Sequence, residues 1–295
     1  MIKYSTKDFE RDFPNDDACL EWLFNNRYPQ GVVCPKCGKV TKHYRIQGRP
    51  CYSCEICGSH VYPMAGTIFE DTKFDHLKMW FKAVAYMSVT RCGISSRQLS
   101  RDIGVTVKTG YRMWKQIRSV LVEEAILTGT VELDETYIGG KAENMHASKR
   151  DKLGGRGTAG KQPVFGAVER GGKVVAMTVP NTDGQTLLPQ IGKHVDSNAT
   201  VYTDEMGAYK HLAELGYKHE VIPHSSHVYV NGNVHTNTIE GFWSQLKRSI
   251  NGTYHHVTVE HLQEYVDEYS FRYSHRNDEQ PMFKTMLAQV VKHSS

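Results

Sequence analysis

The sequence has no hydrophobic run long enough to cross a membrane. No stretch of the 295 residues approaches the roughly 18 consecutive apolar residues that a spanning helix needs. The first residues, MIKYSTKDFERDF, are charged and contain no apolar core of the kind that secretory signals carry. We therefore expect no membrane partner and a cytoplasmic location.

Internal repeats, low-complexity tracts and a glycine-rich nucleotide-binding motif are also missing from the sequence. Hydrophobic residues make up 39% and charged residues 23%, which is ordinary for a globular protein and excludes wholesale disorder. The length corresponds to about two domains of roughly 150 residues each. The net charge of +4 permits a nucleic-acid partner without requiring one.

Cysteine is sparse outside one short segment. Five of the seven cysteines fall between Cys34 and Cys57, in the motifs CPKCG and CEICG and at Cys51. Without export we do not expect disulfides, and two CxxC motifs sixteen residues apart predict a tetrahedral thiolate site for one structural Zn²⁺. The predicted zinc ligands are Cys34, Cys37, Cys54 and Cys57.

One ambiguity concerns Cys51, which forms another CxxC motif with Cys54. We favour Cys54 and Cys57, because a glycine follows Cys57 as one follows Cys37, and glycine allows the tight turn of a metal-binding knuckle. The segment between the motifs is too small to hold a core, so bound zinc would supply its folding free energy.

The segment 72–127 has the pattern of a helix-turn-helix. Ser95 and Thr106 are suited to cap two successive helices, and Gly104 marks the short turn between them. The second helix is expected to expose four basic side chains that suit phosphates or base edges: Lys108, Arg112, Lys115 and Arg118. The alternative is a plain helical hairpin with a solvated basic face.

The segment 128–295 is predicted to be mixed α/β. Alternating apolar residues and a Gly171-Gly172 turn predict the first three strands as an antiparallel set. The expected strands are 131–140, 163–170, 173–179 and 199–203, and the expected helices are 186–195, 209–215, 238–250 and 259–273. Three antiparallel strands, a helix and a further strand before more helices match the order of a ribonuclease H-like fold.

Three carboxylates stand out in this segment. Asp134 lies in the middle of an otherwise apolar strand, which is costly unless the acid is paired or binds a metal. Glu132 shares its face and is a rival. Asp204 follows the strand 199–203, where α/β sheets commonly present functional groups. Glu240 lies on the helix 238–250, and Lys247 is two turns further along the same rim.

Each of these side chains also has an ordinary structural interpretation. Glu240 would complete a capping box with Asn237, Asp204 would cap the next helix, and Lys247 would be a solvated lysine. Taken together, three carboxylates without a counter-charge would repel one another, and divalent cations resolve that repulsion. Two Mg²⁺ ions about 3.5–4 Å apart would serve in-line displacement at phosphorus.

The loop 141–161 contains six Lys or Arg residues against two acids. It is either a solvated loop or a contact to a DNA backbone that orders on binding.

These motifs carry a resemblance that spans nearly the whole chain. The sequence resembles bacterial insertion-sequence transposases of the DDE class, in the ISXO-like branch with an N-terminal zinc ribbon. The matching segments are CPKCG, CEICG, GTIFE (66–70), VELDETYIGGK (131–141), VYTDEMGAY (201–209), HTNTIEGFWSQLKR (235–248) and YVDEYSFRY (265–273).

The resemblance implies a function for these residues. Asp134, Asp204 and Glu240 would be the catalytic triad and would hold two Mg²⁺ or Mn²⁺ ions, with Lys247 and Arg248 on the DNA beside them. The implied reaction cleaves the ends of an insertion sequence and joins their 3′-hydroxyls to target DNA. The implied partner is double-stranded DNA, both element ends and target, bound by a homodimer or larger assembly at the bacterial nucleoid.

The expected domains are an N-terminal helical segment at 1–30, a zinc ribbon at 31–69, a helix-turn-helix region at 72–127 and a catalytic domain at 128–295. Two other functions are consistent with parts of this pattern. One is a domesticated DNA-binding regulator without catalysis, and the other is a two-metal nuclease that cuts without joining strands.

Overall fold

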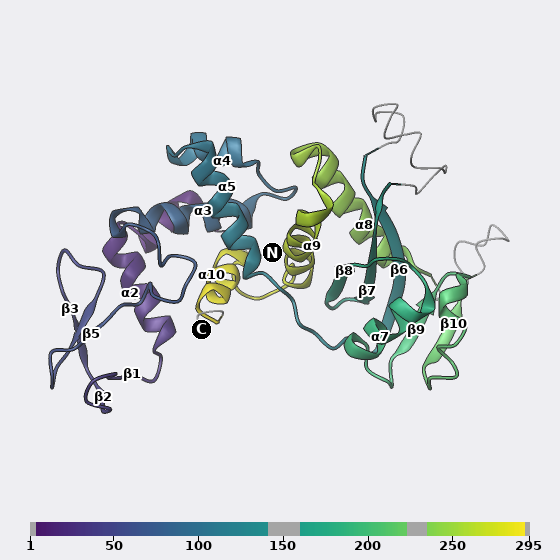
Figure 1. Ribbon diagram of the computed structural model, residues 1–295, viewed down its shortest axis with the longest axis horizontal. Helices are drawn as coiled ribbons and strands as arrows, with labels where there is room; N and C mark the ends of the chain where they lie inside the picture. The colour runs from purple at the N-terminus through teal and green to yellow at the C-terminus, as the bar shows by residue number, and fades with distance from the viewer. Residues whose placement is uncertain (1–3, 141–159, 223–234, 293–295) are drawn as a thin grey trace. The chain divides into compact units, whose positions relative to one another are not determined.

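The computed structural model describes residues 4–140, 160–222 and 235–292 (Figure 1). Two compact units are present: one contains the chain up to Leu121 and the residues from Asn277 onward, and the other is Val122–Arg276. Each unit has its own buried hydrophobic residues. Over the described ranges, no helix combines the length and the apolar character needed to cross a membrane.

The first unit begins with two short helices, α1 (Thr6–Asp12) and α2 (Asp16–Arg27). The last helix of the chain, α10 (Met282–Lys292), packs in the same unit. Phe283 of α10 stacks on Tyr4 with ring centroids 4.7 Å apart and meets the edge of Phe9. The structure therefore differs from the expected domain 128–295, because the apolar face of α10 completes the aromatic core of the first unit.

The cysteine-rich segment forms two small antiparallel sheets. One contains β1 (Val32–Val33) and β2 (Val40–Thr41), and the other contains β3 (His43–Arg45), β4 (Tyr52–Cys54) and β5 (His60–Val61). Gly38 and Gly58 have φ angles of 68° and 67°, in the left-handed region that favours glycine. Their N–H groups donate to the carbonyls of Cys34 and Cys54, so the two knuckles have the same turn.

Three further helices complete the first unit. A turn of 3₁₀ helix, η1 (Phe74–His76), leads into α3 (Leu77–Val89), which is followed by α4 (Ser96–Ile103) and α5 (Val107–Ser119). The predicted caps are confirmed: Ser95 and Thr106 accept hydrogen bonds from the first turns of α4 and α5. Gly104 ends α4 with a φ of 74°. The α4–α5 pair thus has the short glycine turn that the sequence predicts.

The second unit is built on a five-stranded mixed sheet with the order β10-β9-β6-β7-β8. The strands are β6 (Thr130–Ile138), β7 (Gln162–Glu169), β8 (Val174–Thr178), β9 (Thr200–Thr203) and β10 (Lys218–Val221). The first three are antiparallel, and β9 lies parallel to β6. The predicted strand order is confirmed, whereas β10, parallel to β9, was not expected from the sequence.

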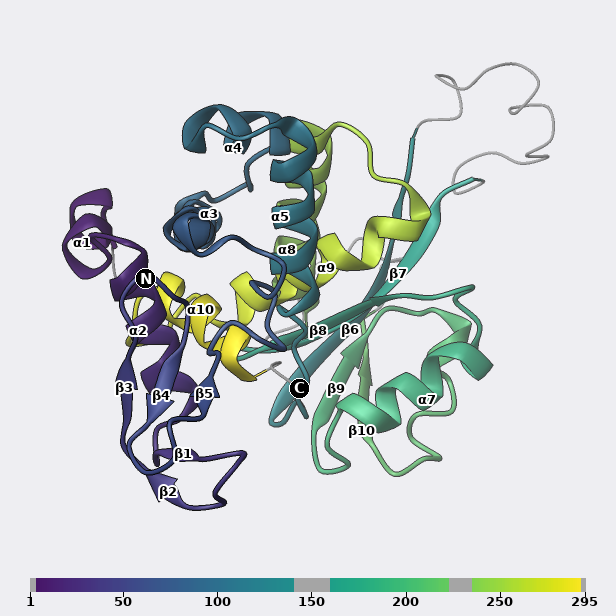
Figure 2. The ribbon, with the colours of Figure 1, turned by 60° about the vertical axis from the view of Figure 1, so that its left-hand side comes forward.

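Helices cover both faces of this sheet (Figure 2). On one face lies α7 (Gly184–His194), and on the other lie α8 (Asn237–Ser249) and α9 (Val259–Ser274). Alternate residues of β6 therefore enter different cores. Val131 and Leu133 pack on the α7 side, and Ile138 packs on the α8 side.

Two predicted helices differ from the structure. Residues 210–215 form turns after a short 3₁₀ helix, η3 (Gly207–Tyr209), and Tyr209 and Leu212 are buried in the core. The helical backbone does not end at residue 250, where the expected helix 238–250 ends. It widens instead into a π-helical segment, η5 (Ile250–Tyr254), which keeps Ile250 buried while Tyr254 packs against Tyr265.

Candidate active site

Asp134 lies on β6 and faces α8. Its Oδ2 accepts a hydrogen bond of 3.0 Å from Nε1 of Trp243, a residue of α8. Directly opposite Asp134 on β7 is Gly166, where an added Cβ would lie 2.6 Å from the Trp243 ring. The absence of a side chain at Gly166 therefore makes room for the indole that holds Asp134.

Asp204 follows the end of β9, the strand beside β6. The parallel register pairs Tyr202 with Glu132, so two further residues along each strand lead to Asp204 and Asp134. Oδ1 of Asp204 accepts a hydrogen bond of 3.0 Å from the backbone N–H of Met206. The parallel pairing thus places both aspartates at the same level of two neighbouring strands, just beyond the end of β9.

Glu240 is an exposed residue in the first turn of α8. The hydroxyl of Thr236 donates to its Oε1 over 3.3 Å. The predicted capping box with Asn237 is wrong, because α8 begins at Asn237 and Thr236 at the N-cap position provides no side-chain cap.

The three carboxylates interact electrostatically. Burial raises the pKa of Asp134 to about 6, and the negative charges of Asp204 and Glu240 add to the increase. Among the described residues, none of the three forms an ion pair with a lysine or arginine. The structure therefore gathers negative charge here without a protein counter-charge, an arrangement that favours a bound cation.

The spacing of these carboxylates is wider than that of a single closed metal site. Within the described ranges, only one group of three or more His, Cys, Asp or Glu side chains has all its ligand atoms within 4.8 Å of one another. That group is the cysteine cluster. The oxygens of Asp134, Asp204 and Glu240 consequently do not all lie within 4.8 Å of one another.

Glu132, the rival of Asp134, is fully buried and has another role. Its carboxylate accepts hydrogen bonds from the backbone N–H groups of Thr238 at 2.8 Å and Ile239 at 3.0 Å. It also pairs with Arg170 at 2.6 Å. These bonds satisfy the free N–H groups in the first turn of α8, so a strand residue caps the helix that carries Glu240.

His235 belongs to the same network. Arg170 donates to the backbone carbonyl of His235 over 2.6 Å, and Nδ1 of His235 lies 3.4 Å from Oε1 of Glu132. The sequence assigned no role to His235 and treated Glu132 only as a competing acid. The cap was missed because Glu132 and the start of α8 are separated by more than one hundred residues.

The four cysteines form the compact group that the sequence predicts. The Sγ atoms of Cys34, Cys37, Cys54 and Cys57 all lie within 4.8 Å of one another. Cys51 is fully buried outside this group, which confirms the choice of Cys54 and Cys57. A hydrogen bond from the Thr41 hydroxyl contributes most to lowering the pKa of Cys54 to about 6. Four converging sulfur ligands suit a structural zinc ion.

Comparison with known proteins identifies the family of the chain. Residues 126–274 match the family model described as an ISXO2-like transposase domain, which covers half of the chain. The chain belongs to this transposase family. Residues 14–60 match the transposase zinc-ribbon domain. The four clustered cysteines thus belong to a transposase zinc ribbon, and a structural zinc is the metal that they suggest.

Two relatives support the assignment of this transposase. A protein named "Uncharacterized protein in transposable element ISH50" from Halobacterium salinarum is 30% identical over 276 residues, which cover 89% of this chain and 92% of the relative. An "Uncharacterized transposase-like protein" from Haemophilus influenzae is 34% identical over 122 residues. That match covers 41% of this chain and 96% of the relative.

The basic residues predicted to bind DNA are exposed on two helices of the transposase. Lys247 and Arg248 are exposed near the end of α8. Lys108, Arg112 and Lys115 are exposed on α5.

The expected exposure of Arg118 is wrong. This residue is only 2% exposed, because it lies one turn beyond Trp114 on the buried face of α5. Residues 141–159 of the predicted basic loop lie outside the described residues.

Glu135 is a further acid near Asp134 and Asp204 that the sequence did not single out. Its pKa is raised to about 8 by burial, with the charges of Asp134 and Asp204 adding to the effect. Its Oε1 is buried without a hydrogen-bond partner among the described residues. Its proximity to Asp204 comes from the pairing of β6 with β9, which the local sequence does not specify.

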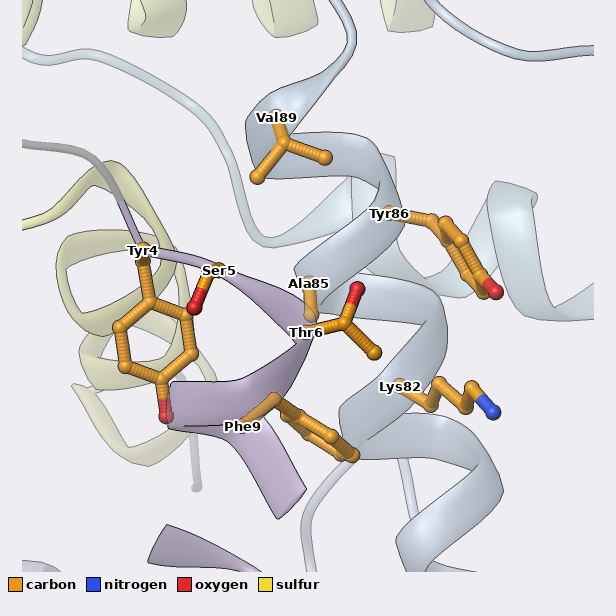
Figure 3. Close-up of a pocket in the computed structure, with 8 residues that line it drawn as sticks. All are labelled: Tyr4, Ser5, Thr6, Phe9, Lys82, Ala85, Tyr86 and Val89. Atoms are coloured by element: carbon orange, nitrogen blue, oxygen red, sulfur yellow. The ribbon is translucent and has the colours of Figure 1, made fainter. Parts of the chain in front are cut away.

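The first unit contains a separate cavity of about 270 Å³ between α1 and α3 (Figure 3). It is lined by Tyr4, Ser5, Thr6, Phe9, Lys82, Ala85, Tyr86 and Val89. Its walls are mainly apolar and include a single cation and no carboxylate, cysteine or histidine. This cavity therefore lacks the metal ligands and acid–base groups that the two sites above provide.

Proposed function

We propose that this chain catalyses transposition of an insertion sequence by cleaving its ends and joining their 3′-hydroxyls to target DNA. In this proposal, Asp134, Asp204 and Glu240 form the catalytic triad on a ribonuclease H-like domain that begins near residue 128. The observation that carries the proposal is the electrostatic interaction of Asp134 on β6 with Asp204, which follows β9, and with Glu240 on α8. None of the three pairs with a protein cation among the described residues.

The donor set fits divalent cations. All three side chains offer carboxylate oxygens, which Mg²⁺ and Mn²⁺ prefer, and Mg²⁺ keeps several waters rather than filling its shell with protein atoms. Two ions about 4 Å apart, each about 2.1 Å from its ligands, accommodate carboxylates spread over roughly 8 Å. Carboxylates that do not all lie within 4.8 Å of one another are therefore compatible with two ions.

Bound ions would activate the attacking oxygen and stabilise the leaving oxygen of an in-line displacement. The protein side chains orient this chemistry. Trp243 holds Asp134 through its indole N–H, and the backbone N–H of Met206 holds Asp204. Glu132 fixes the start of α8, which sets the position of Glu240. Because cleavage and joining are both in-line displacements, one arrangement of carboxylates serves both steps.

The first unit would recognise the DNA. In this proposal the zinc ribbon and the α4–α5 helix-turn-helix bind the terminal inverted repeats, with Lys108, Arg112 and Lys115 on phosphates or base edges. Gly110 supports such a pair of helices, because an added Cβ would lie 2.9 Å from the carbonyl oxygen of Ser96 and would force α5 away from α4. Two ends must be held together for joining, so we propose a dimer or larger assembly on DNA.

A strand-transfer assay tests the proposal. The full chain is incubated with labelled duplexes carrying the DNA that flanks its gene, a target plasmid, and Mg²⁺ or Mn²⁺. We expect cleaved ends and joined product from the native sequence. Asp134→Asn should abolish both products while leaving DNA binding intact, and Asp196→Asn, the same chemical change at a turn before β9, should retain both.

The products separate the proposal from its rivals. Cleavage without joining by the native chain would identify a nuclease, and binding without cleavage would identify a regulator. Cleavage by Asp134→Asn at the native rate would overturn the assignment of the triad.

A further inference from the structure

A polar cleft of about 580 Å³ lies in the same unit as Asp134, Asp204 and Glu240. It is lined by Tyr137, Ile138, Gly139, Gly140, Lys161, Lys247, Ile250, Asn251, His255, His256 and Val257. The lining contains two lysines, two histidines and an asparagine but no acid. Its composition suits an anion and disfavours a cation or an apolar ligand.

The basic groups of this cleft are not neutralised by the described part of the protein. Lys161, Lys247 and His255 make no ion pair or side-chain hydrogen bond within the described ranges, and His256 contributes only a backbone hydrogen bond to Tyr254. Two lysines gathered without an acid repel each other, so a bound anion relieves the repulsion. The cleft therefore has hydrogen-bond donors from two different chain segments available for one ligand.

The backbone around the histidines is also unusual. The π-helical segment η5 widens the end of α8, and His255 follows it with a φ of 60°. His255 is the only non-glycine residue with a positive φ among the described residues. Such conformations cost free energy and are retained where the surroundings require them, often at functional sites. Here the widened turn brings two consecutive histidines to the cleft.

The cleft and the triad share two structural elements. Tyr137 follows Asp134 by three residues on β6, a distance of roughly 10 Å along a strand. Lys247 follows Glu240 by seven residues on α8, which is also about 10 Å along a helix. Measured along β6 and α8, the cleft therefore lies about 10 Å from Asp134 and Glu240. This length corresponds to about three nucleotides of one DNA strand, at 3.4 Å per nucleotide.

We propose that this cleft binds the phosphate backbone of the DNA strand that carries the reacting phosphodiester, about three nucleotides from that bond. Lys161 and Lys247 pair with phosphate oxygens from opposite sides, and His255 and His256 donate hydrogen bonds at the entrance. This assignment rests on the proposed function, because that function supplies the strand. The cleft fixes the register of the strand and so selects which phosphodiester reaches the triad.

Equilibrium binding of the full chain to fluorescent end duplexes tests the assignment. Single methylphosphonates, which are neutral, replace one phosphate at a time on either side of the cleavage site. We expect one position near the third nucleotide to weaken binding by about tenfold, as loss of a charged hydrogen bond does. Lys161→Gln should abolish that sensitivity. It should also make the negative slope of log K against log salt shallower by about 0.9.

Further variants separate loss of a contact from loss of structure. His255→Asn removes the imidazole while keeping a residue that tolerates a positive φ, and it should reduce the same sensitivity. Lys193→Gln, an exposed lysine of α7 on the other face of the sheet, should keep the native salt slope and methylphosphonate profile. The midpoint of thermal unfolding of each variant should remain at the native value.

The result that would overturn the cleft assignment is a methylphosphonate profile that is the same in the native chain, Lys161→Gln and His255→Asn. This failure differs from failure of the proposed function. If the native chain cleaves and joins DNA but the variants keep the native methylphosphonate profile, the proposed function stands and the assignment of the cleft is wrong. If the native chain shows the phosphate-specific contact but never cleaves DNA, the cleft is a DNA-binding site and the proposed catalytic function is wrong.

Discussion

The carboxylate of Glu132 and the backbone nitrogen of Thr238 lie 2.8 Å apart, although 106 positions separate them in the chain. This hydrogen bond joins the central strand β6 to the first turn of α8. Each of these two elements carries one acid of the proposed triad. A buried carboxylate at a helix N-terminus interacts favourably with the free N–H groups and the helix dipole. Glu132 therefore determines how α8, and with it Glu240, meets the sheet.

We expect Glu132→Gln to reduce stability and catalysis together. Loss of the charge leaves Arg170 without its buried partner, which costs about 3 kcal/mol of unfolding free energy. Chemical denaturation and the cleavage rate per folded molecule measure the two effects. Glu268→Gln is the matched control, because Glu268 is also fully buried and pairs with Arg272 at 2.8 Å. It should lose stability but keep the native cleavage rate, and an equal loss of rate in both variants would contradict the positioning role of Glu132.

Gly166→Ala should displace the indole that holds Asp134. The added Cβ would lie 2.6 Å from Trp243, and overpacking of this kind costs about 1–3 kcal/mol. We expect a lower midpoint of thermal unfolding and slower cleavage. Gly192→Ala, on an exposed part of α7 with no atom within 4 Å of the new Cβ, should leave stability unchanged or raise it by up to about 1 kcal/mol. Native cleavage by Gly166→Ala would show that the contact between Trp243 and Asp134 is dispensable.

Magnesium should stabilise the native chain through the triad. At a Mg²⁺ concentration of about 100 times its dissociation constant, binding adds about 2.7 kcal/mol to the free energy of unfolding. For a unit of this size, the midpoint of thermal unfolding should rise by roughly 5–10 °C. Asp134→Asn should lose most of this shift. Without Mg²⁺ its unfolding midpoint should match or exceed the native value, because one repelling charge is removed. Differential scanning calorimetry measures both quantities, with Asp196→Asn as the control that keeps the shift.

Zinc content should distinguish the two CxxC registers. We expect one Zn²⁺ per native chain, one in Cys51→Ser and none in Cys57→Ser. The reason is that Cys57 is one of the four clustered cysteines and Cys51 is not. Removal of zinc with a chelator should expose the segment 31–69 to proteolysis, since its small sheets have no core to replace the metal. Zinc loss in Cys51→Ser with retention in Cys57→Ser would reverse the ligand assignment.

A pH dependence of stability should come from Asp267 on α9. Burial raises its pKa to about 6, with Glu264 adding to the increase and a hydrogen bond from Gln263 opposing it. Because the folded pKa exceeds the unfolded value, this group contributes stability below about pH 4 that is lost as the pH rises through about 6.

Asp267→Asn should therefore gain stability relative to the native chain between pH 4 and pH 7. Thermal unfolding across this range measures the difference. Glu260→Gln, an exposed change on the same helix, should show a nearly constant difference from the native chain. A constant difference for Asp267→Asn as well would contradict the raised pKa.

Local features of the sequence were sufficient for several parts of this protein. The spacing of the two CxxC motifs predicted the four-cysteine cluster, and Ser95, Gly104 and Thr106 predicted the ends of α4 and α5. Alternation predicted β6, β7 and β8. These features depend on contacts between residues close in the chain, and such contacts are encoded in short motifs.

Long-range packing decided the rest. The extra strand β10 depends on backbone pairing with β9. The burial of Arg118 and the placement of α10 in the first unit depend on which side chains meet in the folded core. The role of Glu132 depends on a helix that begins more than one hundred residues later. The sequence by itself determined which acids, cysteines and cations the protein can use. Only the tertiary structure decided which of them meet, because strand pairing and helix packing bring distant residues together in ways that local periodicity does not specify.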